Sequence, residues 1–322
     1  MRPIDPSVTS IPCGLASLLI STSIPGPATA QVLADPPEHH LIGIEAADFC
    51  EHGGWHLVFE DEFNGTTLDA ERWLTFYPFC DNQDECWSSR SGFPDNIAIS
   101  LDSNVRLTGA GTVRIVGRHG PLTSWYGAET VYTSGVLFSR QKFPRGRFES
   151  RIKVPKSTSH FLWPAFWLFG GGPWCSEIDI LEILWKPSHS YHHSLHRYNA
   201  DCVGNYASDE ATHDFPELSD DFHIFRADWD KWFVNFYVDN TLIYRSCRIY
   251  DLQNKPVSNC EVPGGVYLQN QAFPGQDDEL SIILNLSIHK GWDDFHLGHG
   301  PSIPDLPAVM EVDYVRVYQR DP

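Results

Sequence analysis

The stretch Glu177-Ile178-Asp179-Ile180-Leu181-Glu182 places three carboxylates within six residues of otherwise apolar sequence. Apolar and polar residues alternate through Ile180, which is typical of a half-buried strand. In a regular strand, Glu177 and Asp179 share one face and Glu182 points to the other. The alternation slips at Ile180-Leu181, and one extra residue there, a β-bulge, turns Glu182 back to the first face. The pattern therefore predicts a bulged strand with three acids on one surface.

Three acids on one strand face suit the hydrolysis of a glycosidic bond. A retaining glycosidase uses a carboxylate nucleophile and a protonated carboxylic acid about 5–5.5 Å apart. The backbones of Glu177 and Glu182 lie about 13 Å apart at about 3.3 Å per strand residue. Side chains that lean inward on a curved sheet narrow this gap, so the spacing is compatible with retention. The same residues also allow two other interpretations, a solvated face of an edge strand and a cation site.

The segment ahead of this strand carries a resemblance to a known family. Trp163-Pro164-Ala165-Phe166-Trp167-Leu168, then Trp174, then the acidic strand, resembles the active-site region of glycoside hydrolase family 16. These are endo-acting, retaining hydrolases of β-linked glucans and galactans, and the bulged form of their catalytic strand reads E-x-D-x-x-E. The resemblance covers roughly residues 52–319 in the family's order. It includes residues 55–65, 132–135, 146–153, 222–223, 229–230, 236–239 and 312–318.

The resemblance implies roles for the three acids. Glu177 is expected to be the nucleophile and Glu182 the general acid and base. Asp179 is expected to assist, either by raising the pKa of a neighbouring acid through like-charge repulsion or by orienting the nucleophile. The chemistry requires no cofactor.

Other residues are predicted to bind the sugar. Trp163, Trp167 and Trp229 are candidates for stacking on sugar rings, although Trp167 sits in a mostly apolar run that equally suits the core. His196 follows the catalytic strand where the family often places a histidine near the acid/base, and the alternative is a structural role. Asn96 resembles a family position that contacts sugar on the glycone side. Glu149 sits where some members touch substrate, or it pairs with Arg147 or Arg151 along its strand.

A structural calcium site is a further expectation from the resemblance. Many relatives carry one away from the cleft, held by backbone carbonyls near the first strand and in an early turn and by a carboxylate in the last strand. The matching positions here are Glu62, Gly111 and Asp313. Ligation by oxygen atoms is what calcium prefers. The alternative is an ion pair between Asp313 and a basic neighbour.

The rest of the chain predicts an all-β fold. Short apolar-alternating runs are separated by turn residues and no long helical period occurs, which indicates a β-sandwich. The family's jelly roll, with a substrate cleft on the concave sheet, fits this pattern. We expect a signal peptide at 1–30, a linker at 31–50 and one catalytic domain at 51–322. The alternative for residues 1–30, which end in Ala28-Thr29-Ala30, is a disordered leader.

The eight cysteines favour an oxidising compartment. The pairs Cys80–Cys86, Cys175–Cys202 and Cys247–Cys260 are a hypothesis that leaves Cys50 free, because connectivity is not readable from sequence. With the leader, this predicts a protein that is secreted, on the cell surface or periplasmic.

The net charge of the chain limits the classes of partner that it is expected to bind. The chain carries 23 basic and 42 acidic residues, a net charge of −19, which argues against nucleic acid and anionic membranes as partners. We expect a monomer that acts on a polysaccharide, with β-1,3-glucan (laminarin) or β-1,3/1,4-glucan as the leading substrate. A sulfated-galactan hydrolase (agarase, porphyranase or carrageenase), a transglycosylase and a non-catalytic carbohydrate-binding protein remain open. For a sulfated substrate, the candidate contacts are Arg90, Arg118, Arg140 and Arg197.

Overall fold

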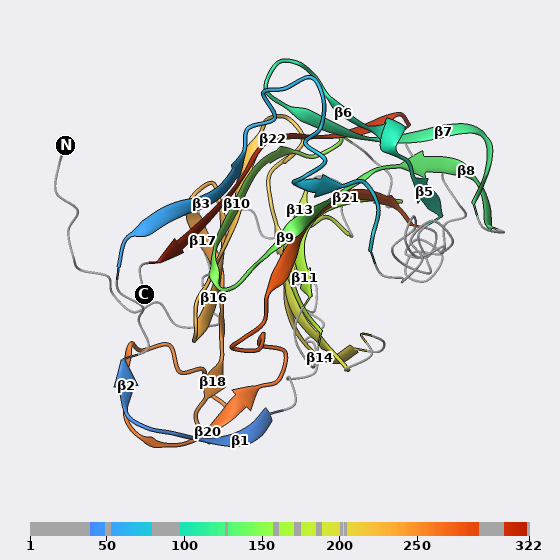
Figure 1. Cartoon of the computed structure of the whole chain (residues 1–322). Helices are drawn as coiled ribbons and strands as arrows, with labels where there is room; N and C mark the ends of the chain where they lie inside the picture. Colours follow the sequence, from blue (N-terminus) through green and yellow to red (C-terminus); the bar gives the residue numbers. More distant parts are fainter. Residues whose placement is uncertain are drawn as a thin grey trace, which may run out of the picture.

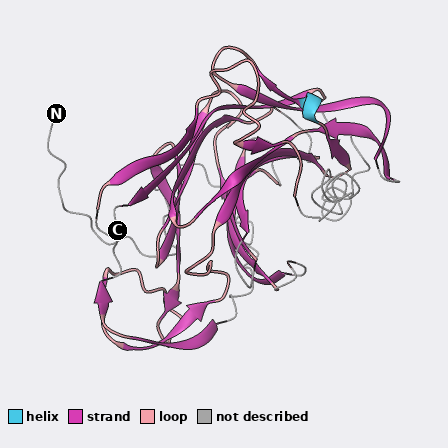
Figure 2. Ribbon diagram, in the orientation of Figure 1, coloured by secondary structure: helices cyan, strands magenta, loops and turns pink. Residues whose placement is uncertain are grey.

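The computed structural model describes residues 39–48, 53–78, 97–125, 128–156, 161–170, 175–184, 189–199, 202, 205–289 and 306–320. In these ranges the chain consists of β-strands and one short 3-10 helix, Asp102–Asn104. Two large sheets pack against each other, and smaller sheets lie at one end of the sandwich (Figures 1 and 2). The predicted all-β sandwich is confirmed.

The larger sheet has ten strands. Its order is β17 (Thr241–Cys247), β16 (Phe233–Val238), β15 (His223–Trp229), β10 (Gly146–Lys153), β22 (Ala308–Arg320), β7 (Val113–Trp125), β8 (Ala128–Ser134) and β5 (Ala98–Ser100), with β3 (Trp55–Asp61) beside β22 and β6 (Val105–Leu107) beside β7. Neighbours run antiparallel except for the pair β5 and β8.

The second sheet has seven strands and carries the acidic stretch. Its order is β14 (Asn205–Asp214), β13 (Ser190–Tyr198), β12 (Ser176–Glu182), β11 (Leu162–Gly170), β21 (Leu280–Ile288), β9 (Val136–Phe143) and β4 (Trp73–Leu74). The acidic strand β12 therefore lies inside the sheet, with partners on both sides. This position excludes the interpretation of an edge strand.

The main hydrophobic core lies between the two sheets. It includes Phe148 and Val315 from the ten-stranded sheet and Ile178 and Leu284 from the seven-stranded sheet. Alternation decides which side chains enter it: along β10, every second residue from Gly146 is buried and those between are half-buried. The outer face of the seven-stranded sheet is consequently the surface on which β12 displays its acids.

The predicted bulge in β12 is confirmed. Leu181 and Asp179 pair with consecutive residues of β11, which leaves Ile180 as the extra residue. One extra residue reverses the side-chain alternation. Glu182 therefore returns to the face that carries Glu177 and Asp179.

Part of the predicted linker is folded. Within residues 31–50, β1 (His39–Ile44) pairs with β20 (Gly265–Asn270), which also pairs with β18 (Ile249–Tyr250). β2 (Ala47–Asp48) pairs with β19 (Glu261–Val262). Ile42 and Ile44 pack against a buried cluster around Trp232 and Phe233. The linker prediction does not hold for residues 39–48, because an apolar run this short gains its stability only from partners distant in sequence.

Two further predictions concern the chain ends and the cysteines. The proposed signal peptide, residues 1–30, lies outside the described residues, as do Cys50, Cys80 and Cys86. The Cys175–Cys202 disulfide is confirmed. Cys247 and Cys260 are both disulfide-bonded, and their pairing with each other stays a prediction. No helix in the described ranges has the length and apolar character needed to cross a bilayer.

Candidate active site

The three acids of β12 are buried together on the outer face of the seven-stranded sheet. Glu177, Asp179 and Glu182 are 9%, 3% and 6% exposed. The residues between them, Ile178 and Ile180, enter the core on the opposite face. The strand pattern thus places apolar side chains inward and concentrates the carboxylates at one surface.

Glu182 is held at each carboxylate oxygen. The indole Nε1 of Trp163, on β11, donates a 2.8 Å hydrogen bond to Oε1 of Glu182. On β13, Nε2 of His192 lies 3.8 Å from Oε2. The hydrogen bond from β11 therefore orients this carboxyl group.

Asp179 and Glu177 are linked to β13 in the same way. The hydroxyl of Ser194 donates to Oδ2 of Asp179, and Nε2 of His196 lies 3.5 Å from the same oxygen. The hydroxyl of Tyr198 donates to Oε1 of Glu177 at 3.3 Å. Every second residue of β13 thus supports an acid of β12.

Burial decides the protonation of these acids. Loss of water around Glu177 and Glu182 raises the pKa of both carboxyl groups well above the usual range, and repulsion from Asp179 acts in the same direction. Burial also raises the pKa of Asp179, while the His196 ring and the Ser194 hydroxyl oppose that rise. A cluster of this kind keeps a proton on one carboxyl group near neutral pH, as an acid catalyst requires.

Among the described residues, this cluster also brings together groups of the kind that bind cations. Ligand atoms of Glu177, Asp179 and His196 lie within 4.8 Å of one another. His196 contacts Asp179 and pairs with Glu177 across the strands, whereas the resemblance implied a place near Glu182.

The predicted tryptophans have different positions. Trp163 is half-buried beside Glu182, as a contact on the acid side of a sugar requires. Trp167 lies on the same sheet face, but its ring is 3% exposed and its Nε1 donates to Oδ1 of Asn285. Trp167 is therefore buried, but in a cluster on the face of the acids that Trp163 packs against, and its contact with sugar stays a prediction. Trp229 is 1% exposed in the core between the sheets, so the prediction that it stacks on sugar is wrong.

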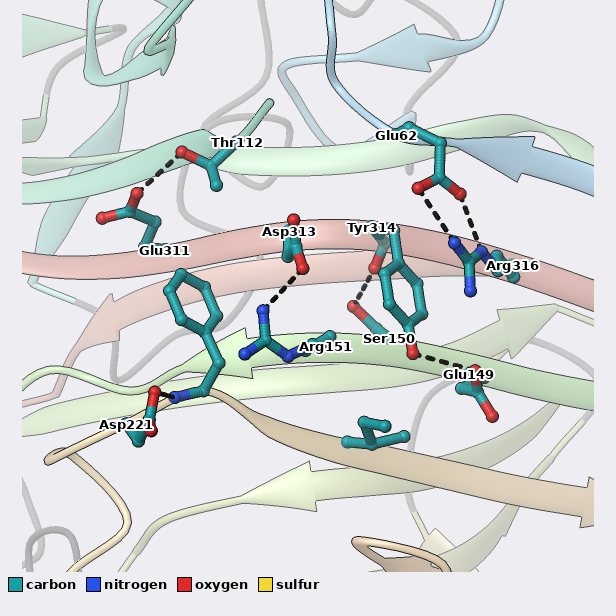
Figure 3. Close-up of polar contacts among 12 residues, drawn as sticks. Glu62, Thr112, Glu149, Ser150, Arg151, Asp221, Glu311, Asp313, Tyr314 and Arg316 are labelled. Atoms are coloured by element: carbon teal, nitrogen blue, oxygen red, sulfur yellow. Dashed lines mark hydrogen bonds and ion pairs between the residues drawn. The ribbon is translucent and has the colours of Figure 1, made fainter. Parts of the chain in front are cut away.

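Glu149 is another correction. It lies on β10 of the ten-stranded sheet, and its neighbours Phe148 and Ser150 are buried toward the core. It accepts a 3.0 Å hydrogen bond from the Tyr314 hydroxyl (Figure 3) and lies 4.0 Å from Arg226. Glu149 thus faces away from the acids and does not reach their substrate. Asn96 lies outside the described residues.

The calcium site stays a prediction, and the structure shows ion pairs at the carboxylates of two of its three positions. Oδ2 of Asp313 pairs with Arg151 at 2.7 Å, and Glu62 forms a two-pronged pair with Arg316 at 2.7 and 2.9 Å (Figure 3). Gly111, the third residue, occupies a left-handed turn position with φ +85°. Both carboxylates already face a guanidinium group, so the alternative of an ion pair at Asp313 is confirmed.

Sequence reasoning missed most of the residues that support the acids. His192, Ser194 and Tyr198 are not among the residues predicted for the site. The signal was present in the polar positions of residues 190–198, which recur at every second residue after the catalytic strand. Reading them required the register between β12 and β13, which pairs Glu182 with His192 and Asp179 with Ser194.

A β-sandwich whose inner strand buries two supported glutamates around an aspartate has the groups that a glycosidase uses. Residues 81–276 match the model of glycosyl hydrolases family 16, and the chain belongs to that family. It is 30% identical over 290 residues to a glucan endo-1,3-β-glucosidase of Cryptopygus antarcticus, covering 83% of this chain and 94% of that protein.

Two further proteins of this kind are similar to the chain, one in sequence and one in fold. A glucan endo-1,3-β-glucosidase A1 of Niallia circulans is 27% identical over 279 residues, which cover 83% of this chain and 38% of that protein. The catalytic domain of a Thermotoga petrophila laminarinase superposes with a TM-score of 0.64 at 24% identity, covering 84% of this chain and 100% of that one. The sandwich is thus the family's jelly roll.

Proposed function

We propose that this chain is an endo-acting, retaining hydrolase of β-1,3-glucan, with mixed β-1,3/1,4-glucan as the nearest alternative substrate. The observation that carries the proposal is the bulged strand β12, which gathers Glu177, Asp179 and Glu182 on one buried surface. The relatives in Cryptopygus and Niallia support the linkage, because both are glucan endo-1,3-β-glucosidases.

The mechanism uses the two glutamates in turn. Glu177 attacks the anomeric carbon while Glu182 transfers its proton to the glycosidic oxygen, so the carbon–oxygen bond breaks and a covalent glycosyl-enzyme forms. Glu182, now a carboxylate, accepts a proton from water, whose oxygen attacks the anomeric carbon and releases Glu177. Two displacements retain the configuration. Both the acid and the nucleophile are side chains of the protein, so the chemistry needs no cofactor.

Asp179 fits an assisting role. It lies on the same face as both glutamates, and its charge raises the pKa of each, after the effect of burial. Once Glu177 is esterified its charge disappears, and the pKa of Glu182 falls toward a value suited to a base. The Ser194 hydroxyl and His196 hold Asp179 in position during these changes.

Charge around the acids supports a neutral glucan over a sulfated galactan. Arg140 lies on β9 and donates to the carbonyl of Ala70. Arg118 lies on β7 of the other sheet. Arg197 alternates with His196 and so faces away from the acids at the end of β13. Arg90 lies outside the described residues. The described arginines proposed as sulfate contacts are therefore not gathered at the site.

Export and a monomeric state are further parts of the proposal. The Cys175–Cys202 disulfide supports an oxidising compartment, and the leader supports secretion. Expression of the full chain, with sequencing of the N-terminus of any secreted product and size-exclusion chromatography, tests both. A chain that stays with the cells and still carries residues 1–30 would contradict export. Elution as a dimer would contradict the monomeric state.

The test of function is product analysis across laminarin, lichenan, agarose, porphyran and carrageenan. The proposal expects release of oligosaccharides from laminarin, with the β-anomer formed first, and no release by Glu177→Ala. Release of oligosaccharides from a galactan alone would mean that the substrate is that galactan and not β-1,3-glucan. Binding of laminarin without release would favour a carbohydrate-binding protein, and transfer to labelled acceptor oligosaccharides in place of water would identify a transglycosylase.

A further inference from the structure

A histidine on the strand beside β12 lies between the acid/base and a second carboxylate. Nε2 of His192 is 3.8 Å from Oε2 of Glu182 and 3.6 Å from Oε2 of Glu210. The three residues come from the adjacent strands β12, β13 and β14. The two displacements described above involve neither His192 nor Glu210, so these contacts have no role assigned yet.

The ring of His192 is fixed on its other side. Its Nδ1 lies 2.7 Å from the hydroxyl oxygen of Thr212, the residue directly opposite on β14. The side chain of His192 is 8% exposed and that of Glu210 is 38% exposed. A ring held at Nδ1 presents Nε2 to the carboxylates in one orientation. A row of polar groups therefore runs from the solvent-facing edge strand to the buried acid/base.

We propose that His192 and Glu210 form a positioning pair for Glu182, in which the imidazole N–H at Nε2 orients Oε2 of the acid/base and stabilises the carboxylate left after proton donation. The inference rests on the proposed function, because it assigns the pair to the acid/base step. The proton that Glu182 delivers goes to the leaving oxygen and is restored from water. The proton on Nε2 of His192 stays in place throughout, so the pair neither supplies nor takes up a proton in the reaction.

Trp163 and His192 act on different oxygens of Glu182. Trp163 donates to Oε1, and His192 faces Oε2. A carboxyl group with both oxygens held presents its proton in one direction, and misplacement by about 1 Å costs roughly a hundredfold in rate. Oε2 of Glu210 faces the same Nε2 from the outer side, at 3.6 Å, and restricts the position of the ring.

Other titratable groups surround the pair and enter its pH dependence. Asp179 on β12 and His193 and His196 on β13 lie close enough to interact with His192, Glu210 or both, as does His213 on β14. The nearby ring of His192 lowers the pKa of Glu210. After burial and Asp179, the charge of Glu210 raises the pKa of Glu182. Loss of the Glu210 charge therefore lowers the pKa of Glu182.

The first experiment compares two leaving groups. Laminarin needs a proton from Glu182, whereas a dinitrophenyl β-laminaribioside has a leaving group that departs without one. His192→Asn keeps a polar group near Thr212 but has none at the position of Nε2, and His192→Gln places an N–H there. We expect His192→Asn to lower kcat/KM about tenfold on laminarin and less than about twofold on the aryl glycoside. We expect His192→Gln to recover most of the loss.

The second experiment uses the exposed end of the pair, where substitution leaves the core intact. Glu210→Gln should move the alkaline limb of kcat/KM on laminarin to lower pH by about 0.5 unit, because that limb reports the pKa of Glu182 in the free enzyme. Asp214→Asn removes the same charge from the same strand, at its far end opposite Ser190. We expect it to leave the alkaline limb in place.

The outcomes separate this inference from the proposed function. Equal losses on both substrates in His192→Asn, or coincident pH profiles for Glu210→Gln and Asp214→Asn, overturn the positioning pair while the glycosidase stands. A wild-type chain that cleaves neither laminarin nor the aryl glycoside overturns the proposed function first. If His192→Asn does not fold, the Glu210→Gln profile decides the question alone.

Discussion

The indole Nε1 of Trp163 donates a 2.8 Å hydrogen bond to Oε1 of Glu182, across the boundary between β11 and β12. Tryptophans beside sugar sites are usually assigned to stacking. Here the ring also contributes a polar contact to the acid/base. A donor to a carboxylate favours its charged form, and so it opposes the effect of burial on the pKa of Glu182.

Trp163→Phe tests this contact. The substitution keeps an aromatic face but removes the N–H, so the pKa of Glu182 should rise and the alkaline limb of activity should move to higher pH. Activity at the optimum should fall about tenfold, because the carboxyl group loses one of its two orienting contacts. The pH profile of kcat/KM is the measurement. Trp167→Phe, on the same strand, removes a hydrogen bond to Asn285 and should change stability without moving that limb.

Deletion of Ile180 tests the role of the bulge. Without the extra residue the strand reads E-x-D-x-E, and regular alternation still places the three acids on one face. The core loses one fully buried side chain, which costs about 2–5 kcal/mol of folding stability. We expect reduced but measurable hydrolysis. Insertion of an alanine after Ile180 gives E-x-D-x-x-x-E, in which regular alternation keeps Glu182 on the same face but moves it about 6.6 Å further along the strand from Glu177. That variant should be as inactive as Glu182→Ala in a reducing-sugar assay, and activity retained by the insertion would refute this account of the bulge.

The catalytic acids should lower the stability of the folded chain. Burial raises the folded-state pKa of Glu182 above its unfolded value of about 4.5. Above that pH the unfolded state releases the proton that the folded state still holds, so stability falls as pH rises until the folded pKa is passed. Glu182→Gln removes this dependence and should raise the free energy of unfolding by about 1–2 kcal/mol near pH 7. Urea unfolding near pH 4 should show little difference between the two chains. A variant that is less stable near pH 7 would contradict the prediction.

His193 should make the stability of the folded chain depend on pH in the opposite direction. It is fully buried, its ring stacks on Phe236 at 4.4 Å, and burial lowers its pKa well below the usual value of 6.5. Below about pH 6.5 the unfolded state binds a proton that the folded state does not, so stability is complete above that pH and falls as pH decreases. His193→Leu should reduce the slope of unfolding free energy against pH by up to about 1.4 kcal/mol per unit in this window. An unchanged slope in urea unfolding between about pH 5 and 6.5 would refute it.

Local pattern was sufficient for the catalytic strand. Alternation and its slip at Ile180-Leu181 predicted both the bulge and the common face of the acids, because those depend on backbone geometry within one strand. The strands of the sandwich followed from the same period. Asp313 was correctly given an ion pair as the alternative to calcium, since a charge on a strand face usually finds a partner on the next strand.

Predictions that needed positions in space were less accurate. Trp229 and Glu149 belong to strands whose sequences look as suitable as those near the acids, but both strands lie in the ten-stranded sheet. One residue enters the core and the other faces outward. His192 and Glu210 gained a candidate role only through the register of β12, β13 and β14. Residues 39–48 appeared unstructured in sequence because their partners, β20 and β19, follow about two hundred residues later.

The most direct measurement is to trap the covalent intermediate. A dinitrophenyl deoxyfluoro-β-laminaribioside forms a glycosyl-enzyme readily and releases it slowly, because the fluorine destabilises the charged transition state of hydrolysis. Peptide mass spectrometry of the trapped chain should find one deoxyfluoro-laminaribiosyl group on the carboxylate of Glu177, and none in Glu177→Ala. A label on Asp179 or Glu182, or a chain that turns over the natural substrate without ever carrying a label, would contradict the assignment of Glu177 as the nucleophile.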